Sequence, residues 1–270
     1  ILLFAALAFC QDGDEILHAN HGFEMYSIVS KVVGAVPKKI EEDVNFNLNI
    51  ENLIDQTNDA TKVIYIASPN NPTGTYLSRD QLVKLMNSIS KNIIVVIDGA
   101  YVEYVQKDDY DKGFSLTDEY ENIILTRTFS KTYGLAALRV GWCYTSQKIA
   151  DIINKIKPPF NTTTISQSLA IKALEDKEHI ENSVKLNSEI KDWFEKELKL
   201  LNIKTRQTEG NFTLIETSEE EAEKISNHLM NDGIIIRRLN SYNLPNFLRI
   251  SIGTKEEMNL TVESLKKFNV

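Results

Sequence analysis

Unbroken apolar segments, separated by amphipathic ones, limit the folds open to this chain. Three such segments occur within residues 61–68 (TKVIYIAS), 93–97 (IIVVI) and 122–129 (NIILTRTF). Because successive side chains of a strand face opposite sides, a strand without polar alternation is buried on both faces, as in parallel sheets. Between the first two, Ser78 and Gln81 predict the capping box of a helix. The pattern predicts an α/β fold, with a mostly parallel central sheet and helices on both faces.

A pair of prolines divides the chain. Lys157-Pro158-Pro159 ends a helical segment, because proline cannot continue a helix. Beyond it, the sequence predicts two long amphipathic helices and then three strands, with helices between and after them. The predicted strands are NFTLIET, GIIIRRL and FLRISIG. A chain of 270 residues is typical of about two domains. We therefore predict a large α/β domain over residues 1–160 and a smaller C-terminal α+β domain over residues 161–270.

The first ten residues, ILLFAALAFC, are almost entirely apolar. They lack the initial Met, the basic residues and the small residue before a cleavage site that typify a signal peptide. We therefore predict a buried helix. Because this helix would begin without a cap, we expect the sequence to be N-terminally truncated.

The overall charge argues against two classes of partner. With 30 basic and 38 acidic residues, the formal net charge is -8, whereas nucleic acids and anionic membranes attract basic surfaces. We therefore predict neither a nucleic-acid nor a membrane partner. Cys10 and Cys143 have neither metal-ligand spacing nor a disulfide pattern. We predict no metal site, a reduced thiol at Cys143 in the core, and a cytoplasmic location.

Polar residues follow the predicted strands where each strand ends, and ligands collect at the carboxyl ends of such strands. They are Asn71 in the turn PNNPTGT, Asp98 and Tyr101 in DGAY, Thr128, Ser130 and Lys131 in TFSK, and Arg139, which opens the strand-like RVGWCY. Taken alone, each of these residues has an ordinary structural role as the alternative, such as a turn residue, a helix N-cap or an ion-pair partner. Their joint occurrence in order favours one site.

Catalysis with pyridoxal 5'-phosphate uses this whole set of side chains. A lysine binds the cofactor's aldehyde covalently, and a carboxylate pairs with the pyridine nitrogen so that the ring can accept electrons. Tyrosine and asparagine can bond the phenolic oxygen, while hydroxyls and an arginine suit the phosphate. The sequence therefore predicts a site for this cofactor.

These motifs resemble the class I and II, fold-type I, aminotransferases. Carried over by the resemblance, Lys131 attaches to the cofactor and Asp98 pairs with its pyridine nitrogen. Asn71 and Tyr101 would contact the phenolic oxygen, and the phosphate would be held by Thr128, Ser130 and Arg139. The catalytic residues implied are Lys131, Asp98 and Tyr101.

The resemblance extends to both ends of the chain. Phe23, in HGFEMY, stands where the family stacks an aromatic ring on the pyridine, although a core aromatic is the alternative. Arg249, in NLPNFLRISIGT, would bind the substrate carboxylate; without the family it reads as a surface arginine. Arg237 or Arg238 is the candidate second anion ligand, or else a solvated strand end. The family's phosphate-cradling turn before the first helix does not occur in this sequence.

Within the family, the stretches KPPFNTTTISQSLAIKALED and GIIIRRLNSYNLPNFLRISIGT most resemble the histidinol-phosphate aminotransferases. The resemblance implies a homodimer that transfers an amino group between histidinol phosphate or imidazole-acetol phosphate and glutamate or 2-oxoglutarate, in histidine biosynthesis. Three alternatives stay open. They are an aminotransferase for aromatic or other amino acids, a decarboxylase of a phosphorylated amino acid, and a non-catalytic binding domain of the same fold.

Overall fold

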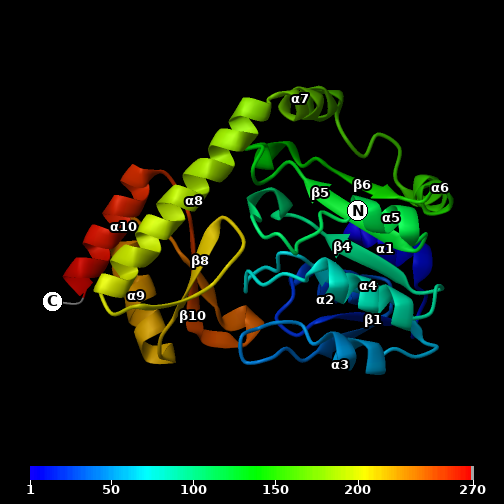
Figure 1. The fold of residues 1–270 in the computed structure, drawn as a ribbon, viewed down its shortest axis with the longest axis horizontal. Coiled ribbons are helices and arrows are strands. Elements are labelled where there is room, and N and C mark those ends of the chain that lie inside the picture. Colours follow the sequence, from blue (N-terminus) through cyan, green and yellow to red (C-terminus); the bar gives the residue numbers. More distant parts are fainter. Residues whose placement is uncertain (269–270) are drawn as a thin grey trace.

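The computed structural model describes residues 1–268 and contains two sheets with surrounding helices (Figure 1). The first sheet has the strand order β2-β1-β3-β4-β5-β6, in which β1 to β5 run parallel and β6 is antiparallel to β5. Its strands are β1 (Glu15–Ala19), β2 (Val36–Ile40), β3 (Thr61–Ala67), β4 (Ile94–Asp98), β5 (Ile123–Thr128) and β6 (Gly141–Thr145). The prediction of a mostly parallel sheet is confirmed.

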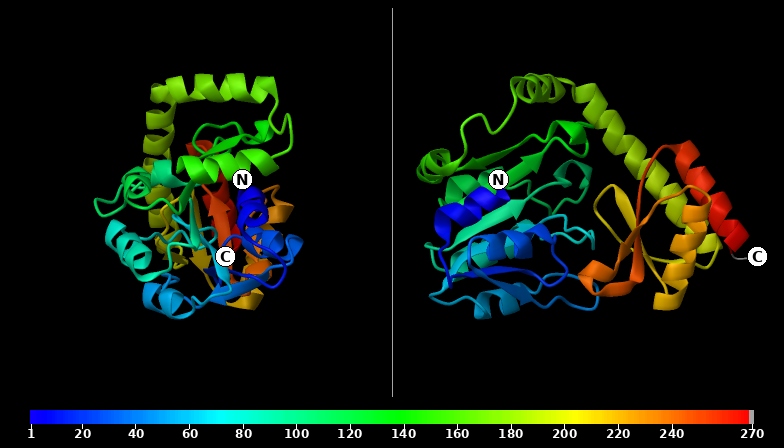
Figure 2. Two further views of the ribbon diagram at one scale, coloured as in Figure 1. Left: turned by 90° about the vertical axis from the view of Figure 1, so that its right-hand side faces the viewer. Right: turned by 180° about the vertical axis from the view of Figure 1, so that it is seen from behind.

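Helices cover both faces of this sheet (Figure 2). One face carries α1 (Leu2–Phe9), α2 (Met25–Val32) and α6 (Gln147–Ile156), and the other carries α3 (Ile50–Asp55), α4 (Arg79–Ser88) and α5 (Phe114–Glu119). Within β3, Val63 and Tyr65 pack on the α1 side, whereas Ile64 and Ile66 pack on the α4 side. Burial of both alternating sets explains why the strand sequence is apolar throughout. The predicted capping box at Ser78 is present.

The second sheet is antiparallel, with the order β7-β8-β10-β9. Its strands are β7 (Lys204–Arg206), β8 (Phe212–Glu216), β9 (Arg237–Leu239) and β10 (Leu244–Ser251). Its helices are α8 (Lys177–Leu200), α9 (Glu219–Asn231) and α10 (Lys255–Phe268), which cover one face. The other face turns toward the first sheet, since the Phe247 ring packs edge-on against Phe46 with 5.2 Å between centroids.

Close contacts dock the second sheet onto the turn that follows β3. The Glu209 amide donates to the Gly74 carbonyl at 2.8 Å, and Lys107 Nζ lies 3.3 Å from Glu209 Oε1. Gly74 has φ +77°, and a Cβ there would lie 2.3 Å from Thr208 Cβ. Only glycine fits this junction without strain. The two sheets fall on either side of residue 160, and the domain boundary itself stays a prediction.

Two local expectations need correction, and one strand was missed. Residues 139–144 do not form one strand: β6 begins at Gly141, and Arg139 occupies the left-handed region at φ +51°, directly after the 3-10 helix η2 (Ala136–Leu138). In GIIIRRL, only Arg237–Leu239 is a strand, and Ile235 is 89% exposed. The missed strand is β2, whose sequence VPKKI contains a proline and two lysines. These residues are tolerated because β2 lies at the sheet edge, so the sequence lacks the apolar run of a central strand.

The predicted first helix is present as α1, but it is buried only in part: Ala5 and Ala6 are fully buried, whereas Leu7 is 48% exposed. Cys143 is a half-buried free thiol packed against the same cluster, and Cys10 is also free among the described residues. No helix within residues 1–268 combines the length and apolarity needed to cross a bilayer. The same residues contain no group of three or more His, Cys, Asp or Glu arranged to hold a metal ion.

Candidate active site

A cavity of about 630 Å³ opens at the carboxyl edge of the first sheet. Parallel pairing brings the ends of β3, β4 and β5 together there, with Ala67 opposite Asp98 and Asp98 opposite Thr126. All eight residues predicted to contact the cofactor line this cavity: Phe23, Asn71, Asp98, Tyr101, Thr128, Ser130, Lys131 and Arg139. The structure therefore brings these eight residues to one place, whereas the predicted substrate-binding Arg249 and Arg237 do not line the cavity. The role of each residue stays a prediction.

Asp98, at the end of β4, is half-buried in the cavity wall. Its Oδ2 accepts a hydrogen bond from the Tyr26 hydroxyl at 3.0 Å, and its Oδ1 accepts one from Thr126 Oγ1 at 3.0 Å. Desolvation raises the pKa of Asp98, whereas these two hydrogen bonds and the nearby Arg127 oppose that rise by favouring the carboxylate. The two donors also fix the direction in which the carboxylate points.

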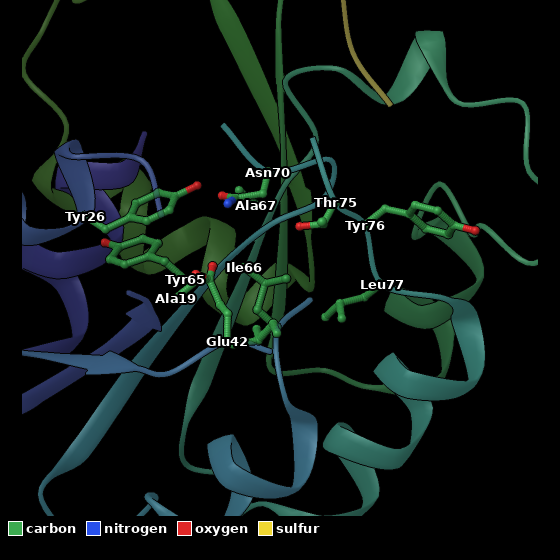
Figure 3. A pocket seen from close by; sticks show the side chains of 11 residues that line it. Ala19, Tyr26, Glu42, Tyr65, Ile66, Ala67, Asn70, Thr75, Tyr76 and Leu77 are labelled. Carbon is green, nitrogen blue, oxygen red and sulfur yellow. The ribbon is translucent and has the colours of Figure 1, made fainter. Parts of the chain in front are cut away.

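Tyr26 is held by the core behind the cavity. Its ring stacks on that of Tyr65 with 4.9 Å between centroids and 5° between planes, and the Tyr65 hydroxyl donates to the Leu2 carbonyl at 2.8 Å (Figure 3). Burial and then the charge of Asp98 raise the pKa of Tyr26, so its hydroxyl remains a donor. The cavity drawn in Figure 3 holds about 20 Å³, room for a water molecule rather than a substrate.

Lys131 lies just beyond β5, in the turn that precedes η2. Its Nζ stands over the ring of Tyr101, 5.1 Å from the ring centroid. Burial lowers the pKa of Lys131, and the positive charges of Arg249 and Arg139 lower it further. A larger share of the amine is therefore neutral and nucleophilic at neutral pH than for a solvated lysine.

Hydroxyls and a guanidinium face the same cavity beside Lys131. The Ser130 amide donates to Thr128 Oγ1 at 3.1 Å, which holds the turn. Arg139 Nη1 donates to the Ala136 carbonyl at 2.8 Å and lies 3.5 Å from Ser130 Oγ. Arg139 has a left-handed backbone, and its guanidinium lies close to the Ser130 hydroxyl. Such a group of donors suits a phosphate.

Arg249 reaches the site from the second sheet. It lies on β10, a central strand, and its Nη1 donates to Asn71 Oδ1. Its Cζ is 5.2 Å from the ring centroid of Phe212. Among residues 1–268, the buried Nε of Arg249 has no hydrogen-bond partner. A buried donor of this kind calls for an acceptor that the protein does not supply.

Strand register separates the two neighbouring arginine candidates. Arg237 is the cross-strand partner of Arg249, so the two side chains share a face of the sheet, whereas Arg238 belongs to the opposite face. Arg237 Nη2 lies 3.8 Å from Glu24 Oε2, next to the cavity residue Phe23, and Arg238 Nη1 lies 3.6 Å from Glu223 on α9. The geometry therefore favours Arg237 as the second arginine near the site.

Sequence reasoning missed four residues that shape this site: Tyr26, Thr126, Arg127 and Phe212. In the sequence, the first three read as ordinary members of a helix or strand, and Phe212 reads as a core aromatic. The one usable signal was the TRT of β5, where polar residues interrupt an apolar strand just before its end.

Comparison with known proteins identifies the family. Residues 1–265 match the aminotransferase class I and II family. The chain belongs to this family. Among curated relatives, the histidinol-phosphate aminotransferase of Zymomonas mobilis is 38% identical over 262 residues, covering 96% of this chain and 71% of the relative. That of Pelagibacter ubique is 39% identical, covering 97% of this chain and 73% of the relative.

Solved structures of class I and II aminotransferases share the fold. Histidinol-phosphate aminotransferase from Sinorhizobium meliloti, in complex with pyridoxal 5'-phosphate, superposes with a TM-score of 0.91 at 23% identity over 99% of this chain and 74% of that chain. Aspartate aminotransferase from Thermotoga maritima gives 0.88 at 24% identity over 99% of this chain and 72% of that chain. These structures confirm the predicted fold type, and membership of the family confirms the predicted enzyme class and cofactor.

The side chains in the cavity suit pyridoxal 5'-phosphate. One cavity contains a lysine with a lowered amine pKa, an acid held by two donors, and hydroxyls beside an arginine. Phe23 adds an aromatic ring to the same wall. These side chains therefore suit, in that order, the cofactor's aldehyde, pyridine nitrogen, phosphate and ring face.

Proposed function

We propose that this aminotransferase exchanges an amino group between histidinol phosphate and 2-oxoglutarate in histidine biosynthesis, with pyridoxal 5'-phosphate as cofactor. The observation that carries the proposal is the shared cavity, in which Lys131 and Asp98 line the walls and Arg249 reaches the edge through Asn71. The substrate assignment rests on curated histidinol-phosphate aminotransferases that are 34–39% identical over nearly the whole chain.

Each side chain has a role that follows from its chemistry. Asp98 would hold a proton on the pyridine nitrogen, and Phe23 would cover the ring. Asn71 and Tyr101 would bond the phenolic oxygen. The phosphate would be bound by three residues grouped near Lys131, namely Thr128, Ser130 and Arg139.

When bound, pyridoxal 5'-phosphate supplies the electron sink that stabilises negative charge at the substrate Cα. The protein supplies the base. With substrate and cofactor in place, Lys131 Nζ would take the proton from the substrate Cα and hold it for its return. The lowered pKa of Lys131 suits this duty, because a base poised near neutral pH both accepts and releases protons.

Arg249 would anchor both substrates. A guanidinium forms paired hydrogen bonds with a carboxylate or a phosphate, so one arginine serves glutamate and histidinol phosphate in turn. Asn71 holds one side of the group, and the unpartnered Nε is available to an acceptor. Arg237, on the same face of the sheet, would add the second positive charge that a phosphate dianion requires.

We also propose a homodimer in the cytoplasm. Exposed apolar side chains cluster on α7 (Thr164–Glu175) and just before it: Phe160, Ile165, Leu169, Ile171 and Leu174. Phe160 is fully exposed and directly precedes Asn161 and Thr162, which line the cavity. Exposed apolar side chains of this kind, next in the chain to residues of the cavity, suit a partner subunit. The two free thiols are in keeping with a reducing compartment.

The test is chemical labelling of the lysine. Borohydride fixes the cofactor to the amine that carries it, so peptide mapping of the wild-type protein should place the label on Lys131, and Lys131→Ala should lose both the label and transamination. A label on another lysine would refute the assignment. Absence of any bound cofactor would favour the non-catalytic alternative.

Substrate profiling with the loaded enzyme separates the remaining alternatives. Histidinol phosphate should give the highest kcat/KM, above aromatic amino acids and other donors. A preference for an aromatic donor, or release of CO2 from a phosphorylated amino acid, would overturn the substrate assignment while leaving the cofactor assignment intact.

A further inference from the structure

Phe212, the first residue of β8, lies between Arg249 and Tyr101. The Arg249 Cζ lies 5.2 Å from the centroid of the Phe212 ring. The Phe212 and Tyr101 rings pack edge-on, with 5.4 Å between their centroids and 82° between their planes. Tyr101 in turn lies under Lys131 Nζ. Phe212 is 1% exposed, so these contacts are shielded from water.

Local structure fixes the ring in this position. The Thr208 hydroxyl donates to the Phe212 carbonyl at 2.6 Å, and Thr208 is itself packed against the Gly74 junction. A Cβ on Gly210 would lie 2.8 Å from Phe212 Cε1, so the ring lies directly against a glycine. The backbone before β8 therefore holds the ring from two directions.

We infer that Phe212 is a positioning residue that holds Arg249 and Tyr101 in one fixed relation. This inference rests on the proposed function, in which Arg249 binds the anionic group of each substrate. Phe212 does not line the cavity, so it would act through Arg249 rather than on the substrate. It acts through the face of its ring, which attracts the guanidinium, and through its contact with Tyr101.

The physical argument concerns the freedom of Arg249. Asn71 bonds Nη1 alone, and the Nε has no partner among the described residues. Without the ring beneath it, the guanidinium would be free to tilt about that single hydrogen bond. Two parallel hydrogen bonds to a carboxylate or phosphate require a fixed plane, so tilting would weaken anion binding.

The experiment keeps the shape of the ring and changes its charge distribution. Incorporation of 3,4,5-trifluorophenylalanine at position 212 weakens the negative face of the ring, and Phe212→Leu removes the ring. The matched control is Phe194→Leu, a fully buried ring on α8 that packs on the opposite face of the same sheet. Glutarate, which lacks the keto group of 2-oxoglutarate, titrates the holoenzyme through the visible absorbance of the bound cofactor.

We expect the trifluoro ring to raise the dissociation constant of glutarate about two- to thirtyfold, the range of a desolvated cation–π contact. Phe212→Leu should raise it at least as much, and Phe194→Leu should leave it unchanged. In steady state, KM for both substrates should rise more than kcat falls. Cofactor affinity should be kept in the trifluoro protein, because the ring retains its shape against Tyr101.

Comparison with Arg249→Lys separates failure of this inference from failure of the proposed function. If Arg249→Lys weakens glutarate binding and the trifluoro ring does not, Phe212 has no part in positioning and the inference falls. If Arg249→Lys also binds glutarate normally, Arg249 is not the anchor, and the proposed substrate binding falls with it. Equal weakening by Phe194→Leu would show a general loss of packing rather than a role for Phe212.

Discussion

Replacing Tyr26 by phenylalanine tests whether the buried hydroxyl keeps Asp98 ionised. The substitution keeps the ring stacked on Tyr65 and removes only the donor that lies 3.0 Å from Asp98 Oδ2. A hydrogen bond to a charged group contributes about 1.5–3 kcal/mol. Because one pKa unit is about 1.4 kcal/mol, losing a bond to the charged form should raise the pKa of Asp98 by about one to two units.

The direction of the pH effect follows from which form the hydroxyl stabilises. The donor favours the carboxylate, so its loss lets Asp98 take up a proton at a higher pH. A protonated Asp98 cannot pair with a pyridinium nitrogen, and activity should therefore fail earlier as the pH is lowered. The acid limb of the kcat/KM profile should move up by about one to two units, while activity above that limb changes little.

The chain offers both a second test and a matched control. Thr126→Val removes the other donor to Asp98, also at 3.0 Å, and should shift the limb in the same direction. Tyr65→Phe removes a neighbouring buried hydroxyl that donates to the Leu2 carbonyl instead. A shift in Tyr65→Phe equal to that in Tyr26→Phe, or a wild-type acid limb in Tyr26→Phe, would refute the reasoning.

Three further predictions follow from the site and its junction. Asp98→Asn should lower kcat by about 10²-fold or more with little change in thermal unfolding, because a neutral amide cannot stabilise a pyridinium; near-normal turnover would reduce Asp98 to a structural cap. The rate at which the apo-protein binds pyridoxal 5'-phosphate covalently should rise through a midpoint below that of a free lysine, since burial and then Arg249 lower the pKa of Lys131. Arg249→Gln should move that midpoint to higher pH in stopped-flow traces, and an unmoved midpoint would exclude the charge effect. Gly74→Ala should destabilise the fold by about 2 kcal/mol or more, since it combines φ +77° with a clash on Thr208, and an unchanged midpoint of unfolding would contradict this.

Periodicity was enough to predict the parts of the fold that are buried on both faces. β3, β4 and β5 appear in the sequence as unbroken apolar runs because helices cover each side of the sheet. Edge elements give no such signal. β2 carries Pro37, Lys38 and Lys39, which an edge strand tolerates and a central one does not, so its sequence resembles a loop.

Site residues were predictable where a polar residue interrupts or ends an apolar segment. They were not predictable where the residue type fits the pattern of a core helix or strand. Asp98 and Lys131 stand out because each follows an apolar strand. Tyr26 does not, because its ring fills a core position on α2 while only its hydroxyl faces Asp98. The role of Phe212 is equally invisible, since it depends on how β8 docks against Tyr101, far away in the chain.

The charge of the site also depends on that docking. The chain as a whole is acidic, with a formal net charge of -8, so its overall field does not attract anionic substrates. Positive charge is instead concentrated locally, where Lys131 and Arg139 of the first sheet's turns meet Arg249 of the second sheet. The two arginines do two things. They offer a binding place to carboxylates and phosphates, and they add to the effect of burial in lowering the pKa of Lys131. Anion recognition and part of the activation of Lys131 therefore have a common physical origin.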